Sequence, residues 1–411
     1  MHTHDVIVIG AGQAGLAISH CLGRRGIDHV VLERGRIGER WRSERWDSLR
    51  LLTPNWQSRL PGRIYRGAQP DGFMSTGELL SLLEAYAADS GAPIRPQTQV
   101  SRVEPNGIGY HVVTDRGSFQ AANVVLATGY SDRPAPPTAA RGLAGSIEQL
   151  APSSYKNPSQ LAPGGVLVVG ASASGVQIAD ELARSGREVT LAVGRHTRMP
   201  RRYRGADMMW WLECIGALDE TADQVRDLTA SRRQPSLQLI GSDPPRDLDL
   251  GTLVRRDVRI CGRVTDASQS RVWFADDLTA SVQRADEKLT RLLQRIDRLI
   301  GQKLRSPAER PAPIVTKPSP RSLDLNAERI SSVIWATGFR RDYGFLRVPV
   351  LDPRGEIVHA RGITRAAGLY VLGLQFQHTR KSSFIDGVGL DAEYIARDIA
   401  ARLGVRESFA A

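Results

Sequence analysis

The sequence contains few cysteines, and none of them has a partner nearby in the chain. Only three occur among 411 residues, at Cys21, Cys214 and Cys261, without a CxxC or CxxxxC pair. This spacing argues against a disulfide framework, a structural zinc site and a dithiol redox centre. Unpaired cysteines are typical of a reducing compartment, so we expect a cytoplasmic protein.

Long apolar runs are also missing. No stretch reaches the roughly 18 apolar residues that a membrane span needs, and no signal peptide precedes the first strand-like segment, so we expect no membrane span. The 55 basic and 44 acidic residues leave a net charge of +11, but the basic residues are scattered and are not interleaved with aromatic ones. This pattern argues against nucleic acid as a partner and is compatible with phosphorylated cofactors.

Two glycine-rich turns are present, each between an aliphatic strand and a helix. The first, in "DVIVIGAGQAGLAISHCL", carries Gly10, Gly12 and Gly15. In this pattern the first glycine permits the turn, the second lets a pyrophosphate approach the backbone, and the third lets helix and strand pack closely. Glu33 ends the next strand, where a carboxylate accepts hydrogen bonds from ribose hydroxyls and repels a 2′-phosphate. The first site therefore predicts FAD or NAD and not NADP.

The second turn, "GASASG", keeps Gly170 and Gly175 but has Ser172 in the middle place. The following strand leads not to an acid but to "GRHTR", which offers Arg195 and Arg198. A guanidinium there suits the 2′-phosphate of NADPH, although a basic surface loop is the alternative. Two turns of opposite charge predict two dinucleotides, FAD and NADPH, with hydride transfer from nicotinamide to flavin.

These units predict an α/β fold with two dinucleotide-binding (Rossmann-like) domains. A strand followed by Ala-Thr-Gly occurs twice, in "VVLATGY" at 124–130 and in "ISSVIWATGF" at 330–339. We assign residues 1–150 and 321–411 to a discontinuous FAD domain. Residues 160–320 are assigned to an inserted NADPH domain that carries a helical insert.

Residue spacing and composition predict four further segments. A helix begins at Ser75 or Thr76, and a long helix with one apolar stripe covers 278–299. The stripe packs on its own domain or, alternatively, forms a homodimer contact or a membrane-facing lid. The Pro-rich stretch 306–320 predicts a stiff linker. The segment Met208–Trp211 is a helix that packs in a core or lines a substrate tunnel.

The order of these motifs resembles the class B flavoprotein monooxygenases, the flavin-containing monooxygenase group, and especially their bacterial NAD(P)/FAD-dependent oxidoreductases. The resemblance covers most of the chain and rests on "GAGQAG", "ERGRIGERWR", "LATGY", "GASASG", "WATGF" and "GLYVLGLQ". It implies that NADPH reduces FAD, and that a C4a-peroxyflavin then passes one oxygen atom of O2 to a nucleophilic N or S of a small-molecule substrate. Such chemistry needs few acid–base side chains, and the sequence shows no convincing catalytic triad or carboxylate pair.

The same resemblance implies further cofactor-binding residues on these motifs, namely Gln13, Ala14, Arg34, Trp41, Arg42, Thr128, Gly129, Ser174, Thr337, Gly338, Gly373 and Gln375. The linker signature of the family is matched in part by "LAGSIEQLAPSSYK", in which Tyr155 and Lys156 arrive two residues late. A Tyr-Lys ending favours oxygenation of N or S over Baeyer–Villiger oxygenation. Asn55, after "LLTP", is the nearest match to a family asparagine beside the flavin. It is the candidate catalytic residue, with a plain turn residue as the alternative.

Several alternatives stay open at this stage. Arg380 or Lys381 in 376–389 would hold an anionic substrate or the flavin, or would belong to a basic loop that caps a helix. An NAD(P)H-dependent flavin reductase, or an oxidase that releases hydrogen peroxide, needs the same two sites as a monooxygenase. A non-catalytic flavoprotein is a third possibility. We predict no metal site, and the substrate is not identified by any spacing in the chain.

Overall fold

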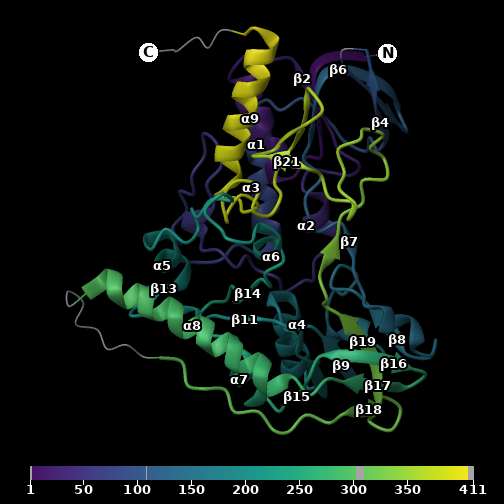
Figure 1. Cartoon of the computed structure of the whole chain (residues 1–411), viewed down its shortest axis with the longest axis vertical. Coiled ribbons are helices and arrows are strands. Elements are labelled where there is room, and N and C mark those ends of the chain that lie inside the picture. Colours follow the sequence, from purple (N-terminus) through teal and green to yellow (C-terminus); the bar gives the residue numbers. More distant parts are fainter. Residues whose placement is uncertain (1, 108, 302–309, 406–411) are drawn as a thin grey trace.

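The computed structural model describes residues 2–107, 109–301 and 310–405. Figure 1 shows an upper body around one sheet and a lower body around a second sheet. The first strand and the last helix both lie in the upper body, so the chain leaves this body and returns to it.

Among the described residues the first sheet has nine strands, and its central strands run parallel. Val6–Ile9 and Val124–Leu126 are buried. A strand covered on both faces needs such an uninterrupted aliphatic run. The strand order is β21 (His359–Ala360), β22 (Ile363–Thr364), β23 (Leu369–Val371), β6 (Gly117–Leu126), β1 (His2–Ile9), β2 (His29–Leu32) and β3 (Ile94–Arg95). Off this path, β5 (Gly109–Thr114) pairs with β6 and β4 (Val100–Asn106) pairs with β5.

Three helices pack with this sheet: α1 (Gln13–Gly23), α3 (Thr76–Asp89) and α9 (Val388–Leu403). The start of α3 is a capping box, in which Ser75 Oγ accepts the Glu78 N–H and the Glu78 carboxylate accepts the Ser75 N–H. This arrangement satisfies two amides that a helix start otherwise leaves free. It confirms the start predicted from the sequence.

The second sheet consists of five parallel strands in the described part of the chain. Their order is β15 (Arg259–Cys261), β10 (Val189–Ala192), β9 (Gly165–Val169), β19 (Ile330–Trp335) and β8 (Glu148–Leu150). Helix α4 (Ala173–Arg184) follows β9 as α1 follows β1. The predicted α/β class with two Rossmann-like units is therefore confirmed.

The sheet order moves the predicted domain boundaries. Strand β19 pairs with β9, and β8 pairs with β19, so both belong to the second sheet. The sequence assignment had put 321–411 and 1–150 in the first domain. The chain returns to the first sheet only after Trp335, because β19 fills the place beside β9 that β6 fills beside β1.

Two short strands join the bodies. Strand β7 (Arg133–Pro134), on the way out of the first sheet, pairs antiparallel with β20 (Phe339–Arg340), on the way back. Figure 1 shows β7 between the upper and lower bodies. The two crossings of the chain therefore form one two-stranded ribbon.

Helix α8 (Leu278–Ile300) confirms the predicted long helix. Leu278, Val282 and Leu289 are buried as the stripe predicts, whereas Leu299 is 57% exposed. The buried residues join two clusters of the lower body, which supports packing on its own domain. Residues 310–320 of the predicted linker have no regular secondary structure, and 306–309 lie outside the described residues.

The remaining elements are short. They are α2 (Glu39–Ser43), α5 (Met208–Cys214), α6 (Leu228–Arg232), α7 (Leu250–Val254), β11 (Thr197–Arg198), β12 (Arg202–Tyr203), β13 (Ala206–Asp207), β14 (Leu237–Gln238), β16 (Val264–Ser268), β17 (Arg271–Phe274), β18 (Ser322–Asp324) and the 3-10 turns Asn55–Gln57, Thr138–Gly142 and Pro158–Gln160. No helix within the described ranges has both the length and the apolar character that a membrane crossing requires.

Candidate functional site

The first glycine turn joins β1 to α1, and at Gly10 and Gly15 it packs too closely against neighbouring backbone to admit a side chain. Gly10 has φ +107°, and a Cβ placed on it would lie 2.6 Å from the Ala127 carbonyl oxygen. A Cβ on Gly15 would lie 1.8 Å from the Gly10 oxygen, whereas a Cβ on Gly12 would meet nothing within 4 Å. No side chain caps α1 at Gly12. The open space faces a helix start whose amides suit a phosphate.

Glu33 is held at the carboxyl end of β2 by the backbone around it. Its side chain is buried; Oε2 accepts the Ala11 N–H at 2.7 Å and Oε1 accepts the Gly35 N–H at 2.9 Å. Each carboxylate oxygen keeps a second lone pair for a ligand hydroxyl. The residues around the first turn therefore fit the ribose and pyrophosphate of a dinucleotide such as FAD.

The first turn opens into a cavity of about 1310 Å³ that both bodies line. Among the residues predicted from the sequence, the cavity brings together Gly10, Gly12, Gln13, Ala14, Glu33, Arg34, Trp41, Thr128, Gly129, Gly373 and Gln375. These residues come from the turn after β1, from α1 and α2, and from the loops that follow β2, β6 and β23, which meet at the carboxyl edge of the first sheet. Ligands of open α/β sheets bind at this edge.

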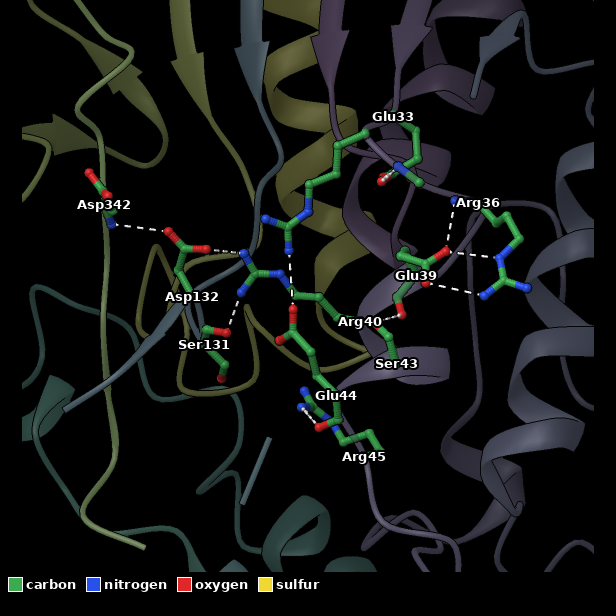
Figure 2. Close-up of polar contacts among 12 residues, drawn as sticks. Glu33, Arg36, Glu39, Arg40, Ser43, Glu44, Arg45, Ser131, Asp132 and Asp342 are labelled. Carbon is green, nitrogen blue, oxygen red and sulfur yellow. Dashed lines mark hydrogen bonds and ion pairs between the residues drawn. The ribbon is translucent and has the colours of Figure 1, made fainter. Parts of the chain in front are cut away.

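The cations at the mouth of the cavity are mostly neutralised by carboxylates. Arg34 pairs with Glu44 at 3.1 Å, and Arg40 pairs with Asp132. The other carboxylate oxygen of Asp132 accepts the Asp342 N–H at 3.2 Å. Figure 2 shows these contacts joining the loop around α2 to the segments near β7 and β20. The mouth is thereby fixed by contacts between segments far apart in the sequence.

Several residues predicted to bind a cofactor do not line the cavity. Arg42 pairs with Glu84, and the Tyr155 hydroxyl donates to Glu181 at 2.6 Å. The Lys156 ammonium donates to the carbonyl oxygens of Ser43 and Arg45. These side chains hold neighbouring segments together, so the structure gives them packing roles in place of the predicted contact with a cofactor.

The candidate catalytic residue Asn55 also lies elsewhere. It is buried in the turn Asn55–Gln57, and its amide donates to the Gln69 carbonyl at 2.9 Å. It lines a separate pocket with His20 and Tyr86, whereas Thr53 lines the main cavity. These contacts agree with the alternative of a plain turn residue, and the catalytic role of Asn55 stays a prediction.

The second turn repeats the geometry of the first. Gly170 has φ +110°, and its Cβ would lie 2.3 Å from the Ala336 oxygen, while a Cβ on Gly175 would lie 1.8 Å from the Gly170 oxygen. Ser172 stands at the start of α4, and its own side chain makes no capping hydrogen bond. Each turn thus packs on the alanine of an Ala-Thr-Gly motif, which explains why this motif occurs twice.

A segment of the chain itself, 235–239, lies against the second turn. Ser236 Oγ accepts the Ala173 N–H at 3.3 Å, and the Gln238 amide donates to the Ala171 carbonyl at 2.8 Å. Ser236 also lines the main cavity. The glycines and the helix start, which includes Ser174, fit a second dinucleotide, but Ser236 occupies one of the amides that would face its phosphates.

The two arginines predicted for the 2′-phosphate differ. Arg195 is exposed after β10. Arg198 is buried, and its guanidinium pairs with Asp249 and Asp286 at 2.7 Å. Arg198 is therefore a buried ion-pair residue and not a phosphate ligand. Arg195 stays a prediction.

Arg380 and Lys381, the candidate anion-binding residues, form ion pairs between the two bodies. Arg380 pairs with Glu220, and Lys381 pairs with Asp219 at 2.8 Å. These contacts join the loop after β23 to the insert of the second body, so neither cation is free for a ligand.

The second Ala-Thr-Gly motif supports the ribbon. Thr337 Oγ1 donates to the Ala135 carbonyl at 2.8 Å, and Gly338 has φ +91°. These residues do not line the cavity. The structure gives them a place at the root of β20, whereas the sequence predicted a cofactor contact.

Part of the cavity comes from the lower body and is not indicated by the sequence motifs. Arg232 ends α6 and Gln234 follows it, and an apolar portion is formed by Met199, Met209, Leu212, Leu218, Leu292 and Phe384. For the segment Met208–Trp211, Met209 lines the cavity, which agrees with the tunnel alternative. Met208 and Trp211 are buried, which agrees with the core-packing alternative. A signal was available for Leu292, which lies on the predicted stripe of α8 but is only half-buried.

Fold and site together define an oxidoreductase of the type with two dinucleotide turns. A family model described as pyridine nucleotide-disulphide oxidoreductase matches residues 7–214, and the chain belongs to this family. An uncharacterized CzcO-like oxidoreductase of Geobacillus kaustophilus is 35% identical over 97% of this chain and 99% of its own length. An uncharacterized oxidoreductase CzcO of Bacillus subtilis is 30% identical over 96% of this chain and 99% of its own length.

A solved structure of a flavin monooxygenase from Stenotrophomonas maltophilia, carrying two substitutions, has the same fold. Its TM-score is 0.71 at 21% identity, and the match covers 98% of this chain and 100% of that chain. This likeness confirms the two-domain fold that the resemblance to the flavin-containing monooxygenase group implies.

Proposed function

We propose that this chain is an NADPH- and O2-dependent FAD monooxygenase that oxygenates a nucleophilic N or S of a small molecule. The observation that carries the proposal is the pair of equivalent turns, the first of which opens into a cavity lined by both bodies. The similarity to a flavin monooxygenase supports the same reaction. Bound flavin and nicotinamide would supply the redox and oxygen chemistry.

The residues of this chain would bind the two cofactors and shield the reacting atoms from water. Glu33 and the start of α1 hold the first dinucleotide, and Ser172, Gly175 and Arg195 serve the second. The apolar portion of the cavity excludes water from the reacting atoms, which is the main protein contribution to such chemistry.

The cysteines separate this function from that of a dithiol reductase. None of the three lines the described cavity. Burial raises the pKa of Cys21 and of Cys261 to about 12, which leaves both as unreactive thiols. Cys214 is exposed and free, which agrees with the proposed location in a reducing cytoplasm.

An oxidase that releases hydrogen peroxide is the second candidate. The observation in its favour is that Tyr155, Lys156 and Asn55 do not line the main cavity. These were the residues that the family resemblance connected with oxygenation.

Stopped-flow absorbance tests the proposal. The purified protein is reduced with NADPH without oxygen and is then mixed with oxygenated buffer. A transient spectrum distinct from both oxidised and reduced flavin, lasting for seconds, supports the monooxygenase. Immediate return to oxidised flavin with one peroxide released per NADPH, unchanged across a panel of amines and sulfides, supports the oxidase. Protein that binds no flavin would contradict both candidates.

A further inference from the structure

The arginines that line the main cavity differ in how their charge is balanced. Arg34, Arg40, Arg133 and Arg380 each pair with a carboxylate. Arg232 also lines the cavity, but no carboxylate in the described part of the chain lies within ion-pair distance of it. Its charge is therefore not neutralised by an ion pair with a described neighbour.

Two other cavity arginines without such a carboxylate have different surroundings. Arg45 stacks over the Trp41 ring, 5.1 Å from its centroid, and donates to the Glu44 carbonyl at 2.8 Å. Arg295 is exposed and donates to the Ile215 carbonyl. Water balances an exposed cation, and an aromatic face partly balances a stacked one. Arg232 is half-buried, no aromatic ring among the described residues stacks on it, and Glu356, which attracts it, is itself paired with Arg341.

The protein contacts of Arg232 leave most of its donors unused. One terminal nitrogen lies 3.3 Å from His359 Nε2 and 3.3 Å from the Phe376 carbonyl oxygen. The Nε–H is buried without an acceptor. A guanidinium carries five N–H donors, and a buried donor without an acceptor costs free energy.

His359 cannot satisfy all the donors around it. Burial lowers the pKa of His359 to about 4, so the ring is neutral at physiological pH. A neutral imidazole has one acceptor nitrogen, yet the Gly362 N–H faces Nδ1 at 3.3 Å while Arg232 faces Nε2. One of these two donors is therefore left without a lone pair, and an anion in the cavity would compensate Arg232.

The remainder of the cavity indicates what carries that anion. Its apolar portion comes from the cluster that holds Met199, Met209 and Leu212, and Phe384 packs against the same cluster. The loop that contains both Phe376 and Phe384 connects Arg232 with this portion. A ligand complementary to this wall has an apolar body and one negatively charged group.

We propose that Arg232 binds the carboxylate of an apolar organic acid and so selects the substrate of this enzyme. The inference rests on the proposed function, which it narrows to substrates that carry an acid group as well as the oxidisable atom. Arg232 lies at the end of α6, away from both glycine turns in the sequence, and each turn provides its own helix start for phosphates.

A matched pair of small molecules tests the proposal without turnover. (Phenylthio)acetate and its neutral amide, (phenylthio)acetamide, share an apolar ring and a sulfur atom and differ in charge. Their Kd values are measured on the FAD-bound protein from changes in flavin absorbance. We expect the acid to bind at least about tenfold more tightly than the amide, as a charge-assisted hydrogen bond implies.

Variants assign the preference to the residue. Arg232→Met should abolish the preference for the acid and leave amide binding unchanged, and Arg232→Lys should retain part of it. Arg295→Met is the matched control, because it removes an exposed cation of the same cavity and should leave the preference intact. Flavin content and Tm of each variant confirm that the protein is folded.

The following binding results would overturn the assignment of Arg232 to the substrate carboxylate. Equal binding of acid and amide by the unmodified protein, or an acid preference that survives in Arg232→Met, overturns the proposal. Weakened NADP+ binding with unchanged acid binding in Arg232→Met would show that this arginine holds a cofactor phosphate, and would overturn it as well. Failure of NADPH to reduce the flavin would count against the proposed function alone, since the binding comparison needs no reduction.

Discussion

Replacing Gly12 by valine separates the folding of the first turn from its ability to bind a ligand. The backbone of Gly12 is extended, with φ −85° and ψ −172°, and any residue adopts such angles. A Cβ at this position meets no atom within 4 Å. Gly12→Val should therefore change the free energy of unfolding of the ligand-free protein by less than about 0.5 kcal/mol, as is usual where no packing is disturbed.

The same valine would fill the space where the start of α1 faces a phosphate. We expect the purified variant to retain less than about a tenth of the flavin per protein, because removing a charge-assisted hydrogen bond at this point weakens the affinity by a factor of about ten or more. Flavin absorbance after gel filtration measures the retained cofactor, and urea unfolding of the ligand-free protein measures the stability.

Gly15→Ala is the matched control for packing. Its Cβ would lie 1.8 Å from the Gly10 carbonyl oxygen, whereas real Cβ contacts stay above 3.0 Å. Helix α1 must then retreat from β1 by about 1 Å, which costs on the order of 1–3 kcal/mol or more in an overpacked core. A Gly12→Val protein that stays fully yellow would refute the assignment of the first turn to FAD. A Gly15→Ala protein as stable as the parent would refute the packing argument.

Four further variants test other features of the structure. Arg198→Ala should destabilise the protein by about 3–5 kcal/mol in urea unfolding, because it leaves buried carboxylates unpaired, and a cost near zero would contradict the ion-pair assignment. Arg195→Glu should raise KM for NADPH roughly tenfold while leaving KM for NADH nearly unchanged, and equal changes would remove the 2′-phosphate argument. Burial raises the pKa of Asp391 from 3.8 to about 6, so the wild-type protein loses stability as the pH rises between these two values. Asp391→Asn should lack that loss and should be more stable than the wild type at pH 7 by up to about 3 kcal/mol. Parallel curves of stability against pH for the two proteins would contradict this. Ser236→Ala should lower the Kd for NADP+ severalfold in calorimetry, because it frees the Ala173 N–H, and an unchanged Kd would show that segment 235–239 does not obstruct the turn.

The two turns could be predicted from the sequence because their determinants are local. Gly15 and Gly175 each avoid a clash with the backbone of their own turn, and Gly10 and Gly170 supply the positive φ of that turn, so the pattern of neighbouring residues contains much of the reason for it. The position of Glu33 at the end of β2 follows from the same unit. The turn glycines and Glu33 occur at fixed positions within a short strand–turn–helix–strand segment, so they can be recognised without knowing the tertiary structure.

The residues whose surroundings were not predicted depend on partners far away in the sequence. Arg198 follows the second unit at the expected place, but Asp249 and Asp286 come from elements about 50 and 90 residues later and hold its charge. Asn55 likewise lies against a later segment, because its amide donates to the Gln69 carbonyl. Arg232 lies in a cavity only because both bodies together form its wall, and no spacing in the sequence indicates this.

Strand β19 shows the same limit at the level of topology. Its sequence repeats the strand and Ala-Thr-Gly of β6, and this similarity favoured a place in the first sheet. The repeat in fact marks equivalent places in two sheets, beside β9 and beside β1. A pattern identifies a strand of this type, whereas the sheet that it joins depends on the pairing of distant segments.

The ribbon of β7 and β20 has a mechanical consequence. A single peptide link between two bodies bends and twists in every direction, but two hydrogen-bonded strands resist stretching and sliding because each would break the ladder. Gly129 and Gly338, both with positive φ, precede the two strands of the ribbon. The two crossings of the chain therefore act as one support, because the lower body cannot slide along the upper one without breaking the pairing of β7 with β20.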